Sequence, residues 1–355
     1  MSSTSLTIAE ILHTSIQSQI AGKRNYPMLQ GPPGIGKTMI VHDYCKDNGY
    51  AYVQIILSRY GSYDIGGLWV PDFESQRLKH FSTDRLLEAV TGYPYTVIHL
   101  DEFSNTDKGT YPVIQSIFTS REIEGKKVPN NVLFVLSGNG PNDGCNTTQM
   151  PIAIRDRIRI HKVGINKEAW IEWAISKKLS PYIIAYHGWS EDSLFKFDPD
   201  SDYEDDTPTT PRSWENLDGF MHLGHKSPMF KEIAATTIGR EEATRFIMFM
   251  NVADNMPTYK EVVENPSSCK FPNDISSNYA VIANISHALL KIEKNNVVLS
   301  QKERQSIVTF VCRFSEEWQV MAIRTFERVS PQFLNSIECS EIEIKHNAIW
   351  NESRK

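Results

Sequence analysis

The sequence predicts an α/β fold in which a largely parallel sheet with helices is followed by a helical part. Short apolar runs alternate with helix-like segments between Ile8 and Leu136. A glycine-rich loop, Gly31–Thr38, lies between one such run and a helix-like segment. From about Asn166 onward strand signals become rare. Strands that alternate with helices are typical of a parallel sheet, so these observations predict an α/β core.

The elements of the N-terminal half follow from the spacing of apolar residues. Ile8–Ile20 has apolar residues at helical spacing, and the pattern breaks at Ala21. Lys37–Asp47 also has a helical period and stops at Asn48 and Gly49, which are typical of a helix C-terminus. We expect helices in both segments. We expect strands at the short apolar runs Tyr26–Gln30, Ala51–Leu57, Thr96–Leu100 and Val132–Leu136.

Other segments are expected to be loops or helices. Gly61–Phe81 and Glu122–Asn130 look like loops that project from the core, the second a turn or small hairpin. The acidic segment Asp198–Asp206 lacks the glycine and the glutamate of an EF-hand loop, so we expect a solvated surface loop. Helical patterning appears at Glu168–Lys178, Ser213–Leu223, Arg240–Met250, Tyr279–Lys294 and Glu303–Arg328.

Composition narrows the class of protein. With 40% hydrophobic and 23% charged residues, the chain has the profile of a soluble globular protein. Its apolar runs are far shorter than the ~20 residues of a membrane-spanning helix. The N-terminus lacks the features of a secretory signal, and the five cysteines are scattered, so we expect a cytoplasmic protein without a cysteine zinc site. A net charge of −6 without a basic stripe disfavours non-specific nucleic-acid binding.

The glycine-rich loop fits the G-x-x-x-x-G-K-[ST] spacing of a phosphate-binding loop, with a predicted strand before it and a helix after it. Its glycines allow backbone N–H groups to wrap a polyphosphate, and the following helix N-terminus favours the same anion. Lys37 is expected to reach the β and γ phosphates, and Thr38 to ligate magnesium. The predicted nucleotide cradle consists of Gly31, Pro32, Pro33, Gly34, Ile35, Gly36, Lys37 and Thr38.

Two further predicted strands end in polar residues. The run Val97–Leu100 is followed by Asp101 and Glu102. We expect Asp101 to hold magnesium, usually through water, and Glu102 to polarise the attacking water. Asn139 follows another strand, and ligands in open α/β sheets bind at the edge formed by such carboxyl ends. The sequence therefore predicts that these side chains share one edge with Lys37.

These motifs resemble those of the AAA+ ATPases. The resemblance rests on a Walker A loop, a Walker B strand that ends in Asp101 and Glu102, and Asn139, which corresponds to that family's sensor 1. Within the AAA+ ATPases, the sequence is most similar to the MoxR type. This similarity spans about residues 7–225 and is found in Tyr63–Gly67, Leu86–Ala89, Ile123–Pro129 and Pro151–Ile158.

The resemblance also implies roles for arginines. Pro151–Ile158 resembles the segment that leads to an arginine finger, whose match here is Arg157, with Arg155 as a nearby alternative. A guanidinium from a neighbouring subunit would stabilise charge on the γ-phosphate. Thr210–Trp214 resembles the sensor 2 start of a lid helix, which implies that the lid carries Arg212 toward the nucleotide.

The resemblance implies a P-loop NTPase of the AAA+ class with a three-layer core. We expect this core at residues 1–163, a helical lid with the acidic insertion at 164–226, and a helical C-terminal extension at 227–355. The implied cofactors are ATP and Mg²⁺. The implied assembly is a homo-oligomeric ring, commonly a hexamer, which hydrolyses ATP at subunit interfaces to remodel or assemble a client protein. A protein with a von Willebrand factor A domain is the first partner to expect.

Two other functions use the same core and stay open at this point. One is a nucleic-acid motor or loader, because a fold does not fix a function. The other is a slowly hydrolysing, nucleotide-dependent scaffold that acts through its C-terminal helices. Stimulation of ATP turnover by DNA or RNA would favour the first, and tight ATP binding with negligible turnover would favour the second.

Overall fold

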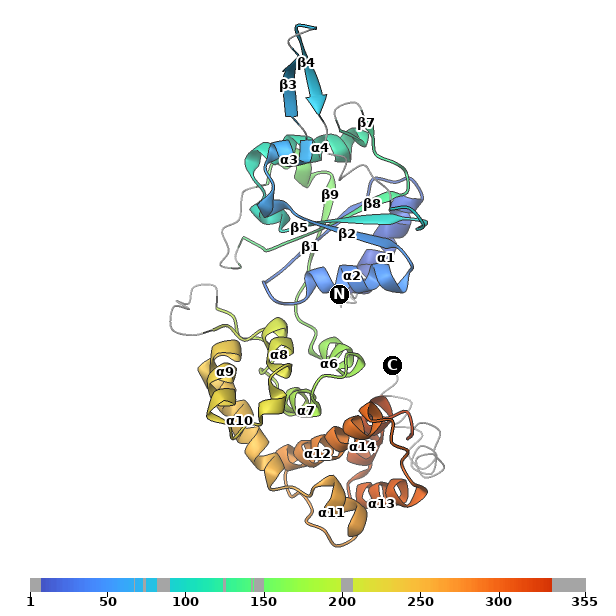
Figure 1. Cartoon of the computed structure of the whole chain (residues 1–355), viewed down its shortest axis with the longest axis vertical. Coiled ribbons are helices and arrows are strands. Elements are labelled where there is room, and N and C mark those ends of the chain that lie inside the picture. Colours follow the sequence, from blue (N-terminus) through green and yellow to red (C-terminus); the bar gives the residue numbers. More distant parts are fainter. Residues whose placement is uncertain are drawn as a thin grey trace, which may run out of the picture. The chain divides into compact units, whose positions relative to one another are not determined.

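The chain divides after Gly164 into two compact units. A computed structural model describes residues 8–66, 68–72, 75–81, 90–123, 126–141, 143, 150–198 and 207–333. The N-terminal unit contains the parallel sheet, and the second unit, which begins at Ile165, is helical (Figure 1). Each unit is described by itself. The predicted α/β class with a helical C-terminal part is confirmed.

The sheet of the N-terminal unit is parallel and has the order β2-β5-β8-β1-β9. All residues of β5 and β8 are buried, as expected for strands covered on both faces. The four predicted strands are confirmed, whereas β9 was not predicted, because charged residues alternate with its apolar ones. The strands are β1 (Tyr26–Gln30), β2 (Ala51–Ile56), β5 (Thr96–Asp101), β8 (Val132–Gly138) and β9 (Ile158–Lys162).

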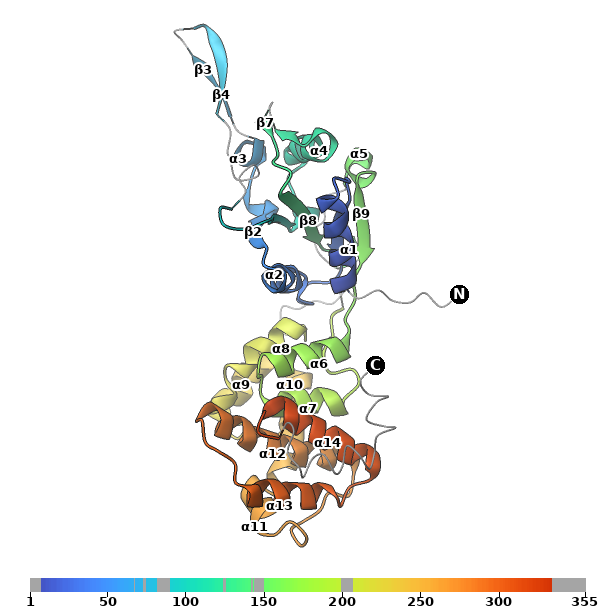
Figure 2. The same ribbon diagram turned by 90° about the vertical axis from the view of Figure 1, so that its right-hand side faces the viewer.

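Helices cover both faces of this sheet and make a three-layer core. Along β8, Leu133 and Val135 pack with α1 and α2, whereas Phe134 and Leu136 pack with α4. This alternation is the period of two of a strand buried on both faces. Figure 2 shows α4 and α2 on opposite sides of the strands. The helices are α1 (Ile8–Ile20), α2 (Lys37–Asp47), α3 (Ser62–Gly66), α4 (Tyr111–Ser120) and α5 (Ile152–Arg155).

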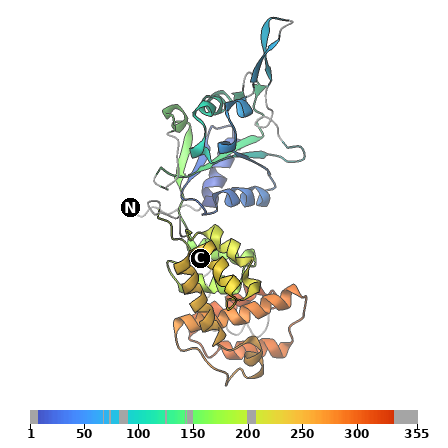
Figure 3. The same ribbon diagram turned by 60° about the vertical axis from the view of Figure 1, so that its left-hand side comes forward.

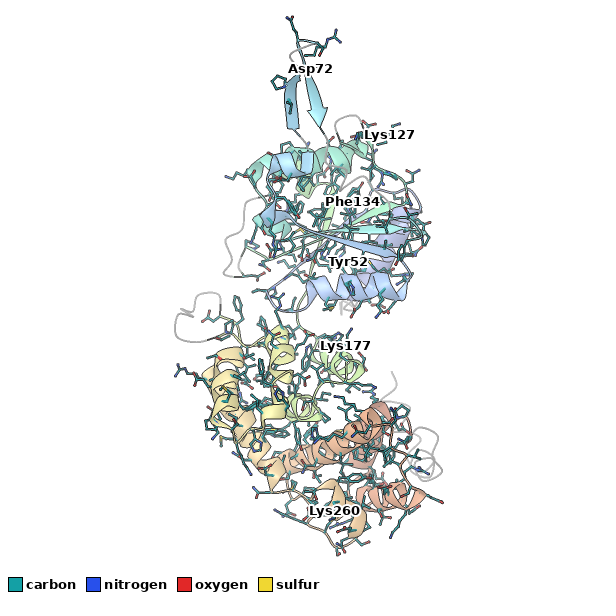
Figure 4. The ribbon with its side chains drawn as sticks, viewed as in Figure 1. Tyr52, Asp72, Lys127, Phe134, Lys177 and Lys260 are labelled. Carbon is teal, nitrogen blue, oxygen red and sulfur yellow. The ribbon has the colours of Figure 1, made fainter. Side chains whose placement is uncertain are left out.

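The segment 61–81 differs from the predicted loop. It contains α3 and an antiparallel ribbon of β3 (Leu68–Asp72) and β4 (Arg77–Phe81). The ribbon extends beyond α3 and α4, and Figure 4 labels Asp72 on it and Phe134 within the sheet. Its two strands pair only with each other in the described structure. Long apolar runs are typical of strands that are buried on both faces of a larger sheet, and these two strands do not belong to one. The predicted small hairpin is confirmed as β6 (Glu122–Ile123) and β7 (Lys126–Lys127).

The second unit is built from helices (Figure 3). They share one hydrophobic core, whose buried residues lie between Ile183 and Phe333 in the sequence. The predicted helices are confirmed, with two differences. Ser213–Leu223 is interrupted, because α8 ends at Asp218 and Met221–Leu223 forms a short 3-10 helix. Glu303–Arg328 is two helices, because α13 ends before Cys312 and Ser315 is the N-cap of α14. The helices are α6 (Lys167–Ser176), α7 (Pro181–Trp189), α8 (Pro211–Asp218), α9 (Pro228–Ile238), α10 (Arg240–Asp254), α11 (Tyr259–Glu264), α12 (Ile275–Lys294), α13 (Gln301–Val311) and α14 (Glu316–Val329).

Several predictions stay open. The division of the helical unit into a lid at 164–226 and an extension at 227–355 stays a prediction. Residues 199–206 of the acidic insertion and the segment Leu86–Ala89 lie outside the described residues. None of the described helices is both long enough and apolar enough to span a bilayer.

Candidate functional site

The glycine-rich loop starts where β1 ends, and its first residue is fixed by close packing. The amide of Gly31 donates to the carbonyl of Gly138 at 3.2 Å, which ties the loop to the end of β8. A Cβ atom on Gly31 would lie 2.2 Å from the carbonyl oxygen of Val163, so no larger residue fits there. The side chain of Ile35 packs against the core beneath α1 and α2. The loop is therefore anchored to β8, to the chain after β9 and to the core.

The loop leads into α2, whose N-terminus has no side-chain cap. Gly34 and Gly36 have φ values of 77° and 90°, a left-handed conformation that glycine adopts readily. Gly36 is the N-cap residue of α2, and no side chain caps the helix there. The first turn also holds no acidic residue. An uncapped helix N-terminus with its positive dipole end is suited to bind an anion such as a phosphate.

Lys37 folds its side chain back over the loop. Its ammonium donates to the carbonyl oxygens of Gly31 at 2.6 Å and Pro32 at 2.7 Å. It also donates to the side-chain oxygen of Asn139 at 3.1 Å. These three acceptors are neutral oxygens, and a phosphate oxygen would be a stronger partner for the ammonium. The ammonium group of Lys37 is therefore held beside the loop by hydrogen bonds that a polyphosphate could replace.

Asp101 joins the loop to the sheet through its carboxylate. Its Oδ2 accepts hydrogen bonds from the Thr38 hydroxyl and the Gln54 amide, both at 2.8 Å. Its Oδ1 accepts from the Ser137 hydroxyl and, at 2.9 Å, from the Glu102 amide. A carboxylate offers about four acceptor positions, so a metal ion that binds Oδ2 directly would take the place of one of the two donors there, Thr38 or Gln54. Two predicted metal-site residues, Thr38 and Asp101, are therefore in direct contact.

The protonation state of Asp101 follows from its partners. Burial raises the pKa of this carboxyl group, but nearby His99 and the hydrogen bonds from Ser137, Thr38 and the Glu102 amide outweigh burial and lower it. The pKa of Asp101 therefore lies below its ordinary value, and the group is ionised at neutral pH. Burial lowers the pKa of His99 to about 4, so this imidazole is neutral at pH 7.

Glu102 faces solvent one residue beyond the end of β5. Its backbone is left-handed, with a φ of 54°, which turns the chain sharply after the buried Asp101. The Ser58 hydroxyl donates to its carboxylate oxygen Oε2. The left-handed backbone of Glu102 explains why its side chain and that of Asp101 face different surroundings. The exposed carboxylate of Glu102 can contact water, as a general base must.

Asn139 lies at the end of β8, and its neighbours leave little freedom. The Ser104 hydroxyl donates to the backbone carbonyl oxygen of Asn139 at 2.7 Å. A Cβ atom on the preceding Gly138 would lie 2.4 Å from the Ser104 hydroxyl and 3.0 Å from the Ser104 amide. Glycine at 138 therefore lets the turn after β5 pack against the end of β8. This packing holds Asn139 where its side chain meets Lys37.

The residues present fit Mg²⁺ bound together with a polyphosphate. Mg²⁺ prefers oxygen ligands and is usually held by one or two carboxylates together with substrate phosphates. Thr38 directs its proton to Asp101, so the lone pairs of its hydroxyl stay available to a cation. In the described part of the chain, no group of three or more His, Cys, Asp or Glu side chains could hold a metal ion. A metal at Thr38 and Asp101 would therefore need ligands from the nucleotide.

The predicted arginines are not brought to the loop by the described contacts. Arg155 is exposed in the last turn of α5. Arg157 is half-buried, and its guanidinium donates to the carbonyl oxygen of Ala153. Arg212 is exposed at the start of α8 in the helical unit, whereas the loop belongs to the N-terminal unit. The roles of all three arginines stay predictions.

Sequence reasoning missed three polar residues that contact the predicted acids and a fourth that contacts one of these three. They are Gln54 and Ser137, which donate to Asp101; Ser58, which donates to Glu102; and His99, which contacts Ser137. A polar residue inside an apolar run was the available signal for His99 and Ser137. Their partners depend on which strands are neighbours, and this order was not known from the sequence.

Comparison with known proteins gives weak likenesses. No family model matches the chain, and no curated protein matches it. The solved structures include the RuvB Holliday junction branch migration motor of Thermotoga maritima, with 14% identity, a TM-score of 0.35, and coverage of 73% of this chain and 74% of that chain. A putative ATPase from Cytophaga hutchinsonii has 10% identity, a TM-score of 0.33, and coverage of 84% and 79%.

A third solved structure, NtrX from Brucella abortus, has 12% identity and a TM-score of 0.32, and covers 98% of this chain and 69% of that chain. Likenesses of this strength carry no argument about the site. The assignment of the fold rests on the parallel order β2-β5-β8-β1-β9 and on the position of the loop after β1. These features define a parallel α/β core in which a strand, a phosphate-loop motif and a helix follow one another, the arrangement of P-loop NTPases.

Proposed function

We propose that this protein binds ATP with Mg²⁺ at Gly31–Thr38 and hydrolyses it. One observation carries the proposal: the side chains of Lys37 and Thr38 contact Asn139 and Asp101, respectively, at 3.1 Å and 2.8 Å. These residues come from three motifs that lie 102 and 63 positions apart along the chain. A chance match to the loop spacing would not explain why residues with complementary chemistry meet at its mouth.

The proposed roles follow from charge and position. Lys37 and the amides of the α2 N-terminus bind the β and γ phosphates. Thr38 and Asp101 hold the metal ion, which neutralises charge on the phosphates when bound. Glu102 orients and polarises the attacking water from its exposed position beside Asp101. Asn139 faces the γ-phosphate. In the structure, its side-chain oxygen accepts a hydrogen bond from Lys37 at this place.

We further propose that the active form is a homo-oligomeric ring, commonly hexameric in the family that the sequence resembles. In this ring Arg157 or Arg155 acts on the ATP of the neighbouring subunit, and Arg212 approaches the nucleotide from the helical unit. The exposure of α5 supports the first role: Arg155 is exposed, and Ile152, three residues before it, is 84% exposed, so a neighbouring subunit can contact this helix.

The proposed output is MoxR-like remodelling or assembly of a client protein, with a von Willebrand factor A domain as the first partner to test. A net charge of −6 favours a protein client over DNA or RNA, whose phosphates would be repelled. Salt-sensitive stimulation of turnover by duplex DNA would reverse this preference. Tight ATP binding without turnover, even beside a client, would instead favour a scaffold.

The test is steady-state phosphate release from ATP in Mg²⁺, together with equilibrium ATP binding. Wild-type protein should release phosphate. Glu102→Gln should bind ATP as wild type does but turn over at least about 100-fold more slowly, because it loses only the group that acts on water. Asp47→Asn, which removes an exposed carboxylate at the end of α2, is the control and should match wild type. Equal losses of binding and turnover in Glu102→Gln would contradict the proposed roles.

A further inference from the structure

A chain of three polar groups, two of them fully buried, lies behind Asp101. Tyr52 of β2, His99 of β5 and Ser137 of β8 come from three neighbouring strands. The Tyr52 hydroxyl lies 2.9 Å from Nδ1 of His99, and Nε2 of His99 lies 2.8 Å from the Ser137 hydroxyl. Ser137 in turn donates to Oδ1 of Asp101. His99 and Ser137 are both fully buried. Polar side chains are seldom fully buried, so their position within the sheet is unusual.

The directions of the two hydrogen bonds nearest Asp101 are determined. A serine hydroxyl has one proton, and that of Ser137 is directed to the Asp101 carboxylate, which can only accept. Ser137 must therefore accept from His99, so Nε2 of His99 carries a proton. The Tyr52 hydroxyl contacts the other ring nitrogen, Nδ1. The donors of His99 and Ser137 both point toward Asp101.

This direction gives the two oxygens of Asp101 different surroundings. Oδ1 accepts from Ser137 and from the Glu102 amide, both fixed parts of the sheet and its end. Oδ2 accepts from Thr38 and from the exposed Gln54. The χ2 torsion of an aspartate has a broad energy profile, so the carboxylate plane is set by such partners rather than by its own rotamer. Fixing Oδ1 therefore presents Oδ2 to Thr38.

We propose that Ser137, oriented by His99, is a positioning residue for the magnesium ion: it holds Asp101 Oδ1 so that Oδ2 faces Thr38 and the metal. This inference rests on the proposed function, because it concerns the metal that accompanies ATP. Partners behind metal-binding carboxylates typically contribute about 10- to 100-fold in metal affinity. A purely structural role for the buried hydroxyl would instead change stability and leave the metal dependence of binding unchanged.

The experiment measures how much Mg²⁺ tightens nucleotide binding. Calorimetry with a non-hydrolysable ATP analogue gives one Kd in EDTA and one in saturating Mg²⁺, and their ratio reports the coupling between metal and nucleotide. Ser137→Ala should lower this ratio about 10-fold or more and leave the Kd in EDTA near the wild-type value. The matched control is Ser116→Ala in α4. It removes a hydroxyl that donates to the backbone carbonyl oxygen of Glu122 at 3.0 Å.

Variants of His99 give an independent test if Ser137→Ala is poorly folded. His99→Gln keeps an N–H donor on a side chain of similar reach and should retain most of the ratio, whereas His99→Leu should lower it. His13→Gln is the control, since it alters another histidine that contacts a tyrosine, Tyr44, at 3.2 Å in the same unit. Equal effects of His99→Gln and His99→Leu on the ratio would overturn the role of His99 as a donor.

The outcomes separate this inference from the proposed function. Wild-type protein that binds no nucleotide would overturn both. Wild-type protein with Mg²⁺-dependent binding, together with an unchanged ratio in folded Ser137→Ala and His99→Leu, would overturn the inference alone. An equal lowering of the ratio of the two Kd values in Ser137→Ala and in Ser116→Ala would also overturn the inference. The effect would then not be specific to the residue that contacts Asp101.

Discussion

The ammonium group of Lys37 lies 3.1 Å from the side-chain oxygen of Asn139. The two residues belong to different motifs and meet because β1 and β8 are neighbours, with Gln30 paired to Gly138 at their carboxyl ends. The contact joins the group proposed to bind phosphate to the residue proposed to face the γ-phosphate. Binding of a polyphosphate would replace this contact at both residues at once.

The first prediction concerns Asn139. Its amide can donate two hydrogen bonds, and we expect it to donate to the phosphate as the bond breaks. Loss of one such donor typically costs about 100- to 1,000-fold in turnover. Asn139→Ala should therefore lower phosphate release on this scale while ATP affinity changes little. Asn131→Ala, just before the opposite end of β8, should behave as wild type, and unchanged release by Asn139→Ala would remove Asn139 from the site.

The second prediction concerns the shared site in the ring. Lys37→Ala and Arg157→Ala should each be nearly inactive alone, because each lacks one half of a site formed by two subunits. In mixed rings an Arg157→Ala subunit keeps its Lys37 loop and a Lys37→Ala neighbour keeps Arg157, so some sites are complete. Phosphate release should therefore recover in part.

Native mass spectrometry must show that the mixed oligomers have formed. The exposed Arg159, which donates only to backbone carbonyls among its described hydrogen bonds, gives the control Arg159→Ala. No recovery in proven mixed rings would exclude Arg157 as a group that acts on a neighbouring subunit. Arg155→Ala should then be mixed in the same way, because Arg155 is the more exposed of the two.

The third prediction concerns the pH dependence of stability. Asp274 caps α12, and hydrogen bonds from the Ser276 hydroxyl and from the amide and hydroxyl of Ser277 lower its pKa from 3.8 to about 2. Because the folded state favours the ionised form, this contribution is complete above the ordinary pKa and is lost as the pH falls from about 4 to about 2. Asp274→Ala should cost about 0.5–2 kcal/mol at pH 7.

Asp274→Asn provides the matched comparison, because asparagine caps a helix about as well but does not titrate in this range. Urea unfolding should give similar stabilities for wild type and Asp274→Asn at pH 7. At pH 3 the wild type should have lost stability relative to Asp274→Asn. Parallel curves for the two proteins over this range would contradict the assignment of this contribution to Asp274.

The fourth prediction tests the packing of α7 against α12. A Cβ atom on Gly188 would lie 2.6 Å from the ring of Tyr279. Alanine favours a helix over glycine by up to about 1 kcal/mol, but overpacking typically costs about 1–3 kcal/mol. Gly188→Ala should therefore destabilise the helical unit in urea unfolding. The control is Gly219→Ala, whose nearest contact would be an ordinary 3.5 Å, and a more stable Gly188→Ala protein would show that Tyr279 can move aside.

Much of the fold could be predicted because its strands are buried on both faces. β1, β2, β5 and β8 are largely apolar runs, and the structure has them within a residue or two of the prediction. β9 is an edge strand in which Arg159 and His161 alternate with isoleucines, so it carries a weaker signal. The ribbon of β3 and β4 depends on the pairing of two segments with each other, which no local pattern reveals.

The candidate site could be predicted only as far as its motifs reach. Lys37, Thr38, Asp101 and Asn139 were expected at one edge because each follows a strand in a recognisable pattern. The partners of Asp101 were not expected, since Ser137 reaches it across two strands that are neighbours only in the folded sheet. Arg212 belongs to a separate unit, so its relation to the loop does not follow from the described contacts of either unit.

The central claim, that Lys37 holds the phosphates of ATP, is tested most directly by calorimetry of ATP binding in Mg²⁺ with Lys37→Ala. A hydrogen bond to a charged group contributes about 1.5–3 kcal/mol, so the variant should bind ATP at least about 10-fold more weakly than wild type. Lys46→Ala, which removes an exposed lysine from the last turn of the same helix, should bind as wild type. Equal ATP affinity of folded Lys37→Ala and wild-type protein would contradict the assignment of Gly31–Thr38 as the nucleotide site.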